Sequence, residues 1–254
     1  MNRLPRILAV VLFAVLSTSV FAHKLPSWTR TAEGVPLEIR LADSAPNGTV
    51  IFAHGCNGPA QGVEVGWSDR FRDAGFNTVG VDSWQWRGIS GGVCQTLAVS
   101  SEERVKEISL ALNWIKQQPW HSGKIFMVGW SHGGGVAMAA STKKDLGLTK
   151  AVAVYPWCDS RFSDAVIPIQ VHIGAADDWT PAYLCKNVYG IFWKNPLGQV
   201  FLYEGVHHSY DFFVHTDSQM PGIGMGNSVQ LRTQRSDPVA RDLTIDRVIE
   251  FFKN

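Results

Sequence analysis

The amino-acid sequence predicts an α/β protein with a mostly parallel central sheet, helices on both faces and an antiparallel hairpin at one edge. From residue 77 onward, short apolar runs alternate with segments of helical periodicity, and crossovers of this kind make neighbouring strands parallel. Before that point, two β-prone runs at 36–41 and 49–53 flank Asn47-Gly48, a strong hairpin-turn signal. Neither an internal repeat nor a linker-like change of composition divides residues 23–254, so we expect a single domain.

The individual elements follow from local patterns. A capping box that begins at Ser100 starts a helix that ends before Pro119, and Asp237 caps a terminal helix. Residues 214–236 show no clear period, and we expect a long loop there, of the kind that often carries function. Buried strands are expected where apolar and β-branched residues cluster, at 77–81, 124–129, 150–155, 168–173 and 199–203.

The first 22 residues have the pattern of a secretory signal peptide. Arg3 and Arg6 precede an apolar run at 7–16, and small residues ending at Ala22 suit a signal peptidase. The apolar run is short for a bilayer span, so we favour cleavage after Ala22 over an uncleaved membrane anchor. We therefore expect residues 1–22 to be a leader and the protein to be exported, either to the periplasm or as a secreted protein.

Charge and composition limit the partners of the protein. The formal charge is +1, becomes −1 if Arg3 and Arg6 leave with the leader, and is not gathered into any basic run. Nothing therefore indicates binding to nucleic acid or to an anionic membrane. The hydrophobic content of 45% is that of an ordinary globular protein. We expect a small-molecule substrate as the partner.

A glycine-rich motif follows the strand expected at 124–129. Gly129-Trp130-Ser131-His132-Gly133 has the form G-x-S-x-G, and a helix of small residues is expected at 134–141. Between a strand and a helix, the glycines permit a sharp turn that presents the serine hydroxyl at the edge of the sheet. The N–H groups that begin the helix would face a developing oxyanion. Ser131 is therefore the candidate nucleophile, in preference to an incidental serine in a glycine-rich turn.

A serine nucleophile requires a base, and the base requires an acid that orients it. In α/β hydrolases these residues follow in the chain order Ser, Asp or Glu, His, each after a later strand. Asp177 and Asp178 follow the fourth expected strand, and His207 and His208 follow the fifth. Spacing from the preceding glycine favours Asp177 as the acid, and register favours His208 as the base. Asp178 and His207 stay the alternatives.

These motifs resemble those of the dienelactone hydrolase family of α/β hydrolases, and the likeness runs through most of residues 23–254. The segments that carry it are FAHGCNGP, GVDSWQWRG, YPWC, IGAADDWTPAYLC and YEGVHHSYD. The resemblance implies an α/β-hydrolase fold in which Ser131 is the nucleophile, Asp177 the acid and His208 the base. It also implies an oxyanion hole made by the backbone N–H groups of Cys56 and His132. The founding enzymes of the family use a cysteine nucleophile, so Ser131 makes ester hydrolysis the expected activity in preference to the founding lactone specificity.

Aromatic and basic residues are expected around the nucleophile. Arg87 and Arg161 lie in segments that should reach the active-site edge of the sheet, where they could hold a substrate carboxylate; a structural ion pair is the alternative. Five tryptophans fall in similar segments and would together form an aromatic pocket wall. They are Trp84, Trp86, Trp130, Trp157 and Trp179.

Other polar residues have structural interpretations. His54 is expected to pack within the oxyanion loop, and His172 to lie inside the fourth strand. Asp211 is expected to be structural or to face solvent. His207, Asp211 and His215 would align as metal ligands only on a helix, which the sequence around them disfavours. We therefore expect neither a metal site nor a cofactor.

The four cysteines permit disulfides in an exported protein, with three complete pairings. Cys158 and Cys185 bracket the acid-bearing strand, so a bond between them would brace the loop of Asp177. Cys94 is an alternative partner for either cysteine.

Together, the ordered motifs predict an exported serine hydrolase that cleaves carboxylic ester bonds, those of lactones included, through an acyl-enzyme. A peptidase or a thioesterase on the same fold is one alternative. A non-catalytic binding protein of this fold is the other, and the intact order of nucleophile, acid and base favours the enzyme.

Overall fold

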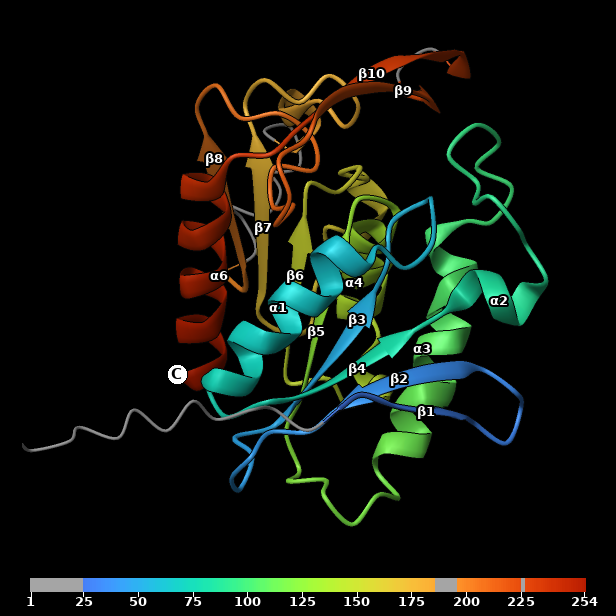
Figure 1. Cartoon of the computed structure of the whole chain (residues 1–254), viewed down its shortest axis with the longest axis vertical. Coiled ribbons are helices and arrows are strands. Elements are labelled where there is room, and N and C mark those ends of the chain that lie inside the picture. The colour runs from blue at the N-terminus through green and yellow to red at the C-terminus, as the bar shows by residue number, and fades with distance from the viewer. Residues whose placement is uncertain (1–24, 186–195, 225–226) are drawn as a thin grey trace, which may run out of the picture.

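The computed structural model describes residues 25–185, 196–224 and 227–254, and the expected leader at 1–22 lies outside this part of the chain. An eight-stranded sheet forms the centre (Figure 1). Its order is β1 (Ser27–Arg30), β2 (Pro36–Arg40), β4 (Asn77–Val81), β3 (Thr49–Ala53), β5 (Ile125–Trp130), β6 (Lys150–Val154), β7 (Ile169–Gly174) and β8 (Gly198–Tyr203). The pairs β1–β2 and β2–β4 are antiparallel, and all other neighbours are parallel. The predicted fold class is confirmed.

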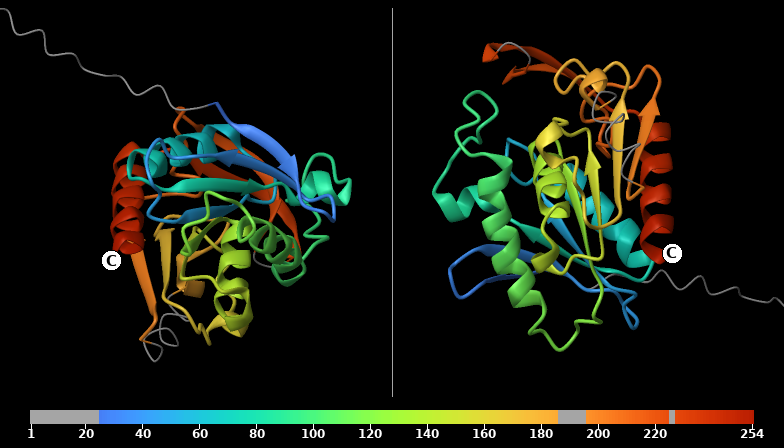
Figure 2. Two further views of the ribbon diagram at one scale, coloured as in Figure 1. Left: turned by 90° about the horizontal axis from the view of Figure 1, so that it is seen from below. Right: turned by 180° about the vertical axis from the view of Figure 1, so that it is seen from behind.

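Helices cover both faces of the sheet (Figure 2). On one face lie α3 (Ser101–Ile115) and α4 (His132–Ser141), and on the other α1 (Gln61–Asp73) and α6 (Pro238–Lys253). Because successive side chains of a strand point to opposite faces, β3 contributes Ile51 to the first core and Val50 to the second. None of the helices in the described ranges has both the length and the apolar character needed to cross a bilayer.

Two helices begin where the sequence predicts. The Ser100 hydroxyl accepts from the Glu103 N–H (3.1 Å), and the Glu103 carboxylate accepts from the Ser100 N–H (2.7 Å), which completes the capping box of α3. The Asp237 carboxylate accepts from the Ala240 N–H (2.9 Å) at the start of α6. These caps satisfy backbone donors that have no partner inside the helix. Both predicted starts are confirmed.

The hairpin predicted at 36–41 and 49–53 is wrong. Strand β2 pairs with β1 and β4, whereas β3 pairs in parallel with β4 and β5. Every residue of β3 is buried, so the strand is stabilised more by a central position than by a local turn. Asn47 joins the turn before β4 instead, where its N–H donates to Gly75 O (2.7 Å) and its amide to Ala74 O (3.1 Å). The edge hairpin is made by β1 and β2.

The loop predicted at 214–236 is also wrong for most of its length. Strands β9 (Asp217–Ile223) and β10 (Val229–Arg235) form an antiparallel pair that lies beyond the carboxyl ends of β7 and β8 (Figure 1). More than half of their residues are exposed, the apolar Val229 and Leu231 among them, so no buried apolar face marks these strands in the sequence. The segment is a hairpin next to the candidate site.

Smaller differences concern the ends of elements. Strands β5 and β7 each begin and end one residue later than predicted, and β8 begins one residue earlier. Helix α4 begins at His132, two residues before its predicted start. The last change matters for the site, because it places the residue after Ser131 at the first position of the helix.

Candidate active site

Ser131 occupies the turn between β5 and α4. Its φ of 52° and ψ of −114° are neither helical nor extended, and its N–H donates to Val154 O (2.9 Å). A Cβ on Gly129 would collide with the Gly133 carbonyl, and a Cβ on Gly133 would collide with the Ala53 carbonyl. Glycine at both positions is needed for the backbone to turn this sharply, which accounts for the G-x-S-x-G spacing.

Three side chains meet at the carboxyl ends of β5, β7 and β8. His208 Nε2 lies 3.0 Å from Ser131 Oγ, and His208 Nδ1 lies 2.7 Å from Asp177 Oδ2. Because a carboxylate only accepts, Nδ1 of the neutral ring donates to Asp177, and Nε2 accepts from the serine hydroxyl. His208 and Asp177 are only 2% and 5% exposed, so water does not compete for these bonds. This geometry suits transfer of the serine proton to the imidazole.

The turn after β7 separates the two candidate acids. Asp177 Oδ1 accepts from the N–H groups of Trp179 (2.9 Å) and Thr180 (2.8 Å), and Oδ2 accepts from the Thr180 hydroxyl (2.9 Å). The Asp178 carboxylate points instead to β10, where it accepts from the N–H and the hydroxyl of Thr233 (2.9 Å each). The structure brings Asp177 to His208 and ties Asp178 to the hairpin.

The two candidate bases also separate. The His208 ring lies against Tyr155 and Trp179, with ring centroids 4.6 and 5.0 Å apart. His207 lies against Arg235 of β10, with 3.2 Å between its Nε2 and the guanidinium Nη1. Aromatic rings on both sides therefore limit the orientations open to His208, the histidine next to Ser131.

Tyr155 and Asp211 form a buried support behind His208. The Tyr155 hydroxyl donates to Asp211 Oδ1 (2.6 Å), and Trp67 Nε1 donates to Asp211 Oδ2 (2.9 Å). Asp211 has no exposed surface, and burial raises its pKa to about 6. Of the two expectations for Asp211, the structural one holds.

Sequence reasoning missed both Tyr155 and Thr180. The Asp-x-x-Thr spacing from Asp177 to Thr180 is a usable signal, because such residues hydrogen-bond within local turns. Tyr155 has no comparable signal. It follows β6 at a positive φ of 38°, and it faces His208 only because β6 and β8 end at the same edge of the sheet.

The predicted oxyanion-hole residues lie on two segments beside Ser131. Cys56, in the loop after β3, borders both cavities that reach Ser131. Gly55 packs against Ser131, since a Cβ there would lie 3.6 Å from Ser131 Cβ. His132 is the first residue of α4, where a backbone N–H has no acceptor within the helix. The two segments could therefore supply N–H groups to one oxyanion.

Four cysteines form two disulfides in the structure, Cys56–Cys94 and Cys158–Cys185. The second is the pairing that the sequence analysis favoured, and it links the segment after β6 to the segment after Asp177. The first joins the loop after β3 to the segment before α3, and it is the pair that remains when Cys158 is bonded to Cys185. One disulfide thus ties the loop of Cys56, and the other ties the segment after Asp177, to a distant part of the chain.

Two cavities of unequal size border Ser131. The smaller has a volume of about 70 Å³ and the larger about 330 Å³, and Trp179 lies between them. Large side chains of the smaller cavity are Glu64, Trp130, Tyr155 and Phe212. Those of the larger cavity are Leu97, Trp157, Phe162 and Ile223.

Three of the five tryptophans predicted to wall a pocket lie beside Ser131. Trp130, Trp157 and Trp179 border the cavities. Trp84 and Trp86 make other contacts: Trp84 Nε1 donates to Cys56 O (2.9 Å), and Trp86 Nε1 donates to Glu33 O (3.0 Å). Both lie on the short helix α2 (Ser83–Arg87), and neither indole borders the two cavities.

Neither predicted arginine is placed as a carboxylate receptor. Arg87 forms a two-pronged ion pair with buried Glu107, with Nε–Oε1 and Nη2–Oε2 distances of 2.7 and 3.0 Å. The structural alternative therefore holds for Arg87. Arg161 borders the larger cavity, but it is exposed and already paired with Asp159 (2.7 Å) and Glu102 (3.1 Å).

Within the described ranges, no group of histidine, cysteine, aspartate and glutamate side chains is arranged to hold a metal ion. His207, Asp211 and His215 lie in a segment that is not helical, so they do not share a helix face. His172 is a core histidine, as expected. Its Nδ1 bonds to the Tyr203 hydroxyl (2.8 Å) and its Nε2 to Gln170 Oε1 (3.2 Å).

Comparison with known proteins identifies relatives among the dienelactone hydrolases. The model of the dienelactone hydrolase family matches residues 89–254, which is more than half of the chain. A carboxymethylenebutenolidase of Pseudomonas putida is 28% identical over 122 residues, which cover 44% of this chain and 49% of the relative. The chain thus matches about half the length of that curated relative.

Solved structures share the fold at low sequence identity. A protein described as a dienelactone hydrolase, from Klebsiella pneumoniae subsp. pneumoniae, superposes with a TM-score of 0.72 at 13% identity, covering 90% of this chain and 98% of the other. Esterase 2 of Thermogutta terrifontis, phosphoramylated by tabun, gives a TM-score of 0.66 at 14% identity, covering 89% and 93%. The sheet topology and these neighbours define an α/β-hydrolase fold.

Within that fold, the chain belongs to the dienelactone hydrolase family. The family resemblance inferred from the motifs is confirmed.

Proposed function

We propose that this protein is an exported serine hydrolase that cleaves carboxylic ester bonds, lactones included, with Ser131, His208 and Asp177 as its catalytic triad. Membership of the dienelactone hydrolase family supports hydrolysis of esters or lactones. The observation that carries the triad is the unbroken chain of hydrogen bonds from Ser131 Oγ through His208 to Asp177, at 3.0 and 2.7 Å.

The first half of the reaction forms an acyl-enzyme. His208 Nε2 takes the proton of Ser131 Oγ as the oxygen attacks the ester carbonyl carbon. The N–H groups of Cys56 and His132 hold the negative charge that develops on the carbonyl oxygen. Asp177 stabilises the imidazolium through Nδ1. The imidazolium then protonates the departing alkoxide, which leaves as the alcohol.

The second half restores the enzyme. Water replaces the alcohol, His208 takes one of its protons, and the hydroxide attacks the acyl carbon. Collapse of the second tetrahedral intermediate returns the proton to Ser131 and releases the carboxylic acid. For a lactone the alcohol and the acid are parts of one molecule, so the product is a single hydroxy acid.

The cavities support a preference for an ester with substituents of unequal size. One cavity beside Ser131 offers about 70 Å³ and the other about 330 Å³, and the surface of both is more apolar than polar, although Glu64 borders the smaller and Arg161 the larger. A short group on one side of the carbonyl and a larger apolar group on the other would fill both spaces.

Export is supported by the leader-like residues 1–22 and by the two disulfides, since disulfides persist mainly in oxidising compartments. A periplasmic or secreted location is therefore part of the proposal. Mass measurement of the protein purified from its native compartment tests it. A chain that begins after Ala22 is expected, and an intact chain recovered from the cytoplasm would contradict export.

The test of the activity uses a fluorophosphonate probe, which phosphonylates an activated serine. The wild-type protein is expected to carry one adduct on Ser131, located by mass spectrometry, and to hydrolyse p-nitrophenyl esters. Ser131→Ala should lose the adduct and about 10⁶-fold in kcat. Ser218→Ala, which removes an exposed hydroxyl on β9, is the matched control and should keep both. Absence of adduct and of turnover in folded wild-type protein would favour a binding role instead.

A further inference from the structure

Arg104 is a buried cation that the proposed chemistry does not yet use. It lies near the start of α3 and is 1% exposed. The N-terminus of a helix is an unfavourable place for positive charge, so helix stability does not account for the residue. No ion pair among the described residues includes it, and Glu107, one turn away, is bonded to Arg87. Burial lowers its pKa to about 9, which leaves it positively charged at neutral pH.

On one side, Arg104 holds the loop that carries Cys56. Its Nη1 donates to the His54 carbonyl (2.9 Å). His54 Nε2 accepts from the Ser83 N–H (3.1 Å), so in the neutral ring Nδ1 carries the proton and donates to Gly55 O (2.7 Å). Arg104 Nη2 lies 3.3 Å from that protonated Nδ1, so this second approach is not a hydrogen bond.

The Gly55 carbonyl and the Cys56 N–H belong to the same peptide unit. The bond from the His54 ring to Gly55 O therefore sets the direction in which the Cys56 N–H points. The next peptide unit is held as well, because Cys56 O accepts from Trp84 Nε1 (2.9 Å) and from the Val93 N–H (2.8 Å). The Arg104 guanidinium lies over that same indole, 4.6 Å from the ring centroid.

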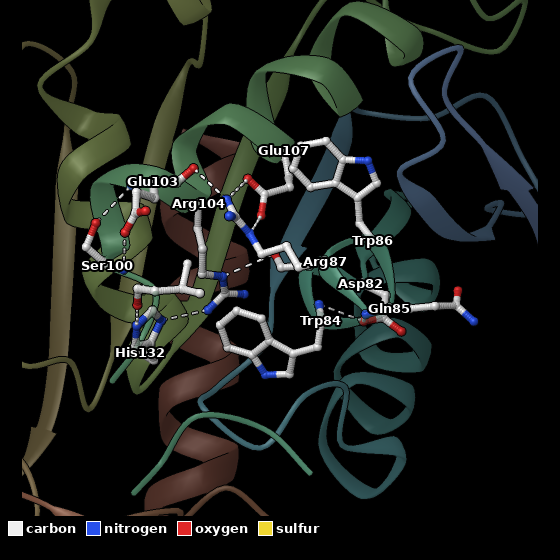
Figure 3. A network of polar contacts seen from close by, with 12 residues as sticks. Asp82, Trp84, Gln85, Trp86, Arg87, Ser100, Glu103, Arg104, Glu107 and His132 are labelled. Atoms are coloured by element: carbon white, nitrogen blue, oxygen red, sulfur yellow. Dashed lines mark hydrogen bonds and ion pairs between the residues drawn. The ribbon is translucent and has the colours of Figure 1, made fainter. Parts of the chain in front are cut away.

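On the other side, Arg104 holds the residue that follows the nucleophile. Its Nη1 lies 2.9 Å from His132 Nδ1. Because a guanidinium only donates, Nδ1 must be the acceptor, and the ring proton is on Nε2, which donates to Val99 O (2.8 Å). Burial, and then the charge of Arg104, lower the pKa of His132 to about 4, so this tautomer is neutral at neutral pH. Figure 3 shows Arg104 between Trp84 and His132, next to the pair Arg87–Glu107.

We propose that Arg104 is the positioning residue of the oxyanion hole: one guanidinium fixes the loop of Cys56 and the start of α4 relative to each other, so that their two N–H groups converge on one oxygen. The inference rests on the proposed function. Arg104 acts through His54 and His132 and touches no reacting atom. Lysine could not replace it, because a single ammonium cannot reproduce a planar fork that stacks on an indole and serves acceptors on separate segments.

The test compares Arg104→Met with Arg87→Met, its neighbour in the same network. Arg104→Met should lower kcat by about 100-fold, comparable to loss of one oxyanion donor, and leave KM within about threefold. Affinity for an alkylboronic acid, which mimics the tetrahedral intermediate, should fall by the same factor as kcat/KM. Arg87→Met leaves the buried Glu107 carboxylate without its ion-pair partner, so the variant should lower Tm but keep kcat. If folded Arg104→Met has the kcat of Arg87→Met, the proposal is overturned.

Two further variants apply if Arg104→Met does not fold. His132→Asn keeps an acceptor near the Nδ1 position, whereas His132→Leu removes it while Arg104 stays in place. The proposal expects kcat of the Leu variant to be about tenfold below that of the Asn variant, because without the bond to Arg104 the oxyanion-hole N–H groups are displaced. Equal kcat values would overturn it. The two hypotheses fail differently: wild-type protein without esterase activity rejects the proposed function together with this inference, whereas active variants of unchanged kcat reject only the inference.

Discussion

The two halves of the site are held by different kinds of contact. In the acid–base half, the acid is held by local bonds, since Asp177 is oriented by the N–H groups of Trp179 and Thr180, two and three residues further on. The oxyanion half depends on residues far away in the sequence. Arg104 bonds to a carbonyl 50 residues before it and to a ring 28 residues after it.

This difference indicates how sensitive the geometry of each half is to changes elsewhere in the fold. A local turn forms from neighbouring residues and keeps its shape if distant parts of the fold relax. A loop held by long-range bonds keeps its shape only when the whole assembly around it is intact. We therefore expect changes far from Ser131 to affect the oxyanion half more than the acid–base half.

The largest expected effect tests the acid–base half. Asp177→Asn should lower kcat by about 10⁴-fold, because an amide does not hold His208 in the tautomer that accepts the serine proton. Asp178→Asn is the matched control, since its carboxylate bonds only to Thr233 in this part of the structure. It should keep kcat within about threefold. Steady-state kinetics with a saturating p-nitrophenyl ester measures both, and equal losses would show that Asp178 shares the role of the acid.

The disulfides offer a direct comparison of the two halves. They join residues 38 and 27 positions apart, so removing either should cost a similar free energy of unfolding, about 4 kcal/mol in the chain-entropy description. The kinetic effects should differ. The double variant Cys56→Ser/Cys94→Ser should lower kcat by about 10- to 100-fold, because the oxyanion donor is displaced.

The control is Cys158→Ser/Cys185→Ser. It should lower Tm by a similar amount but change kcat by less than about threefold, because local bonds still orient Asp177. Thermal unfolding and kcat are measured on both double variants at a temperature where both are folded. Equal kcat losses would contradict the contrast between long-range and local support.

The smallest expected effect concerns stability. Burial lowers the pKa of His132 from 6.5 to about 4, so between these pH values the ring is neutral in the folded state and charged in the unfolded state. The stability that this provides is complete above pH 6.5 and is lost as the pH falls below that value towards 4. At pH 5 the loss relative to pH 7 is about 2 kcal/mol.

Urea unfolding of the wild type and of His132→Asn at both pH values checks this. The variant should lose about 2 kcal/mol less than the wild type between pH 7 and pH 5. Asp211 and Glu64, whose pKa values burial raises to about 6 and about 8, act in the opposite direction. They are present in both proteins, so the difference isolates His132. An identical pH dependence in the two proteins would mean that His132 is not buried as a neutral ring.

The features that sequence predicted well are those encoded by neighbouring residues. The caps at Ser100 and Asp237 and the turn around Ser131 each depend on side chains within a few positions of the backbone they serve. The hairpin expected at Asn47-Gly48 failed for a related reason. That turn signal is local, but burial of β3 between β4 and β5 outweighs it.

The sequence by itself determined the fold class, the chain positions of strands β2 to β8, the family, and the candidates for a nucleophile, an acid and a base, because periodicity and short motifs record local geometry. Only the tertiary structure decided between Asp177 and Asp178, paired Arg87 with Glu107, joined Cys56 to Cys94, and placed Arg104 between His54 and His132. Each of these contacts joins segments that meet because parallel strands end at one edge of the sheet. No pattern in a single sequence records which distant side chains that edge will bring together.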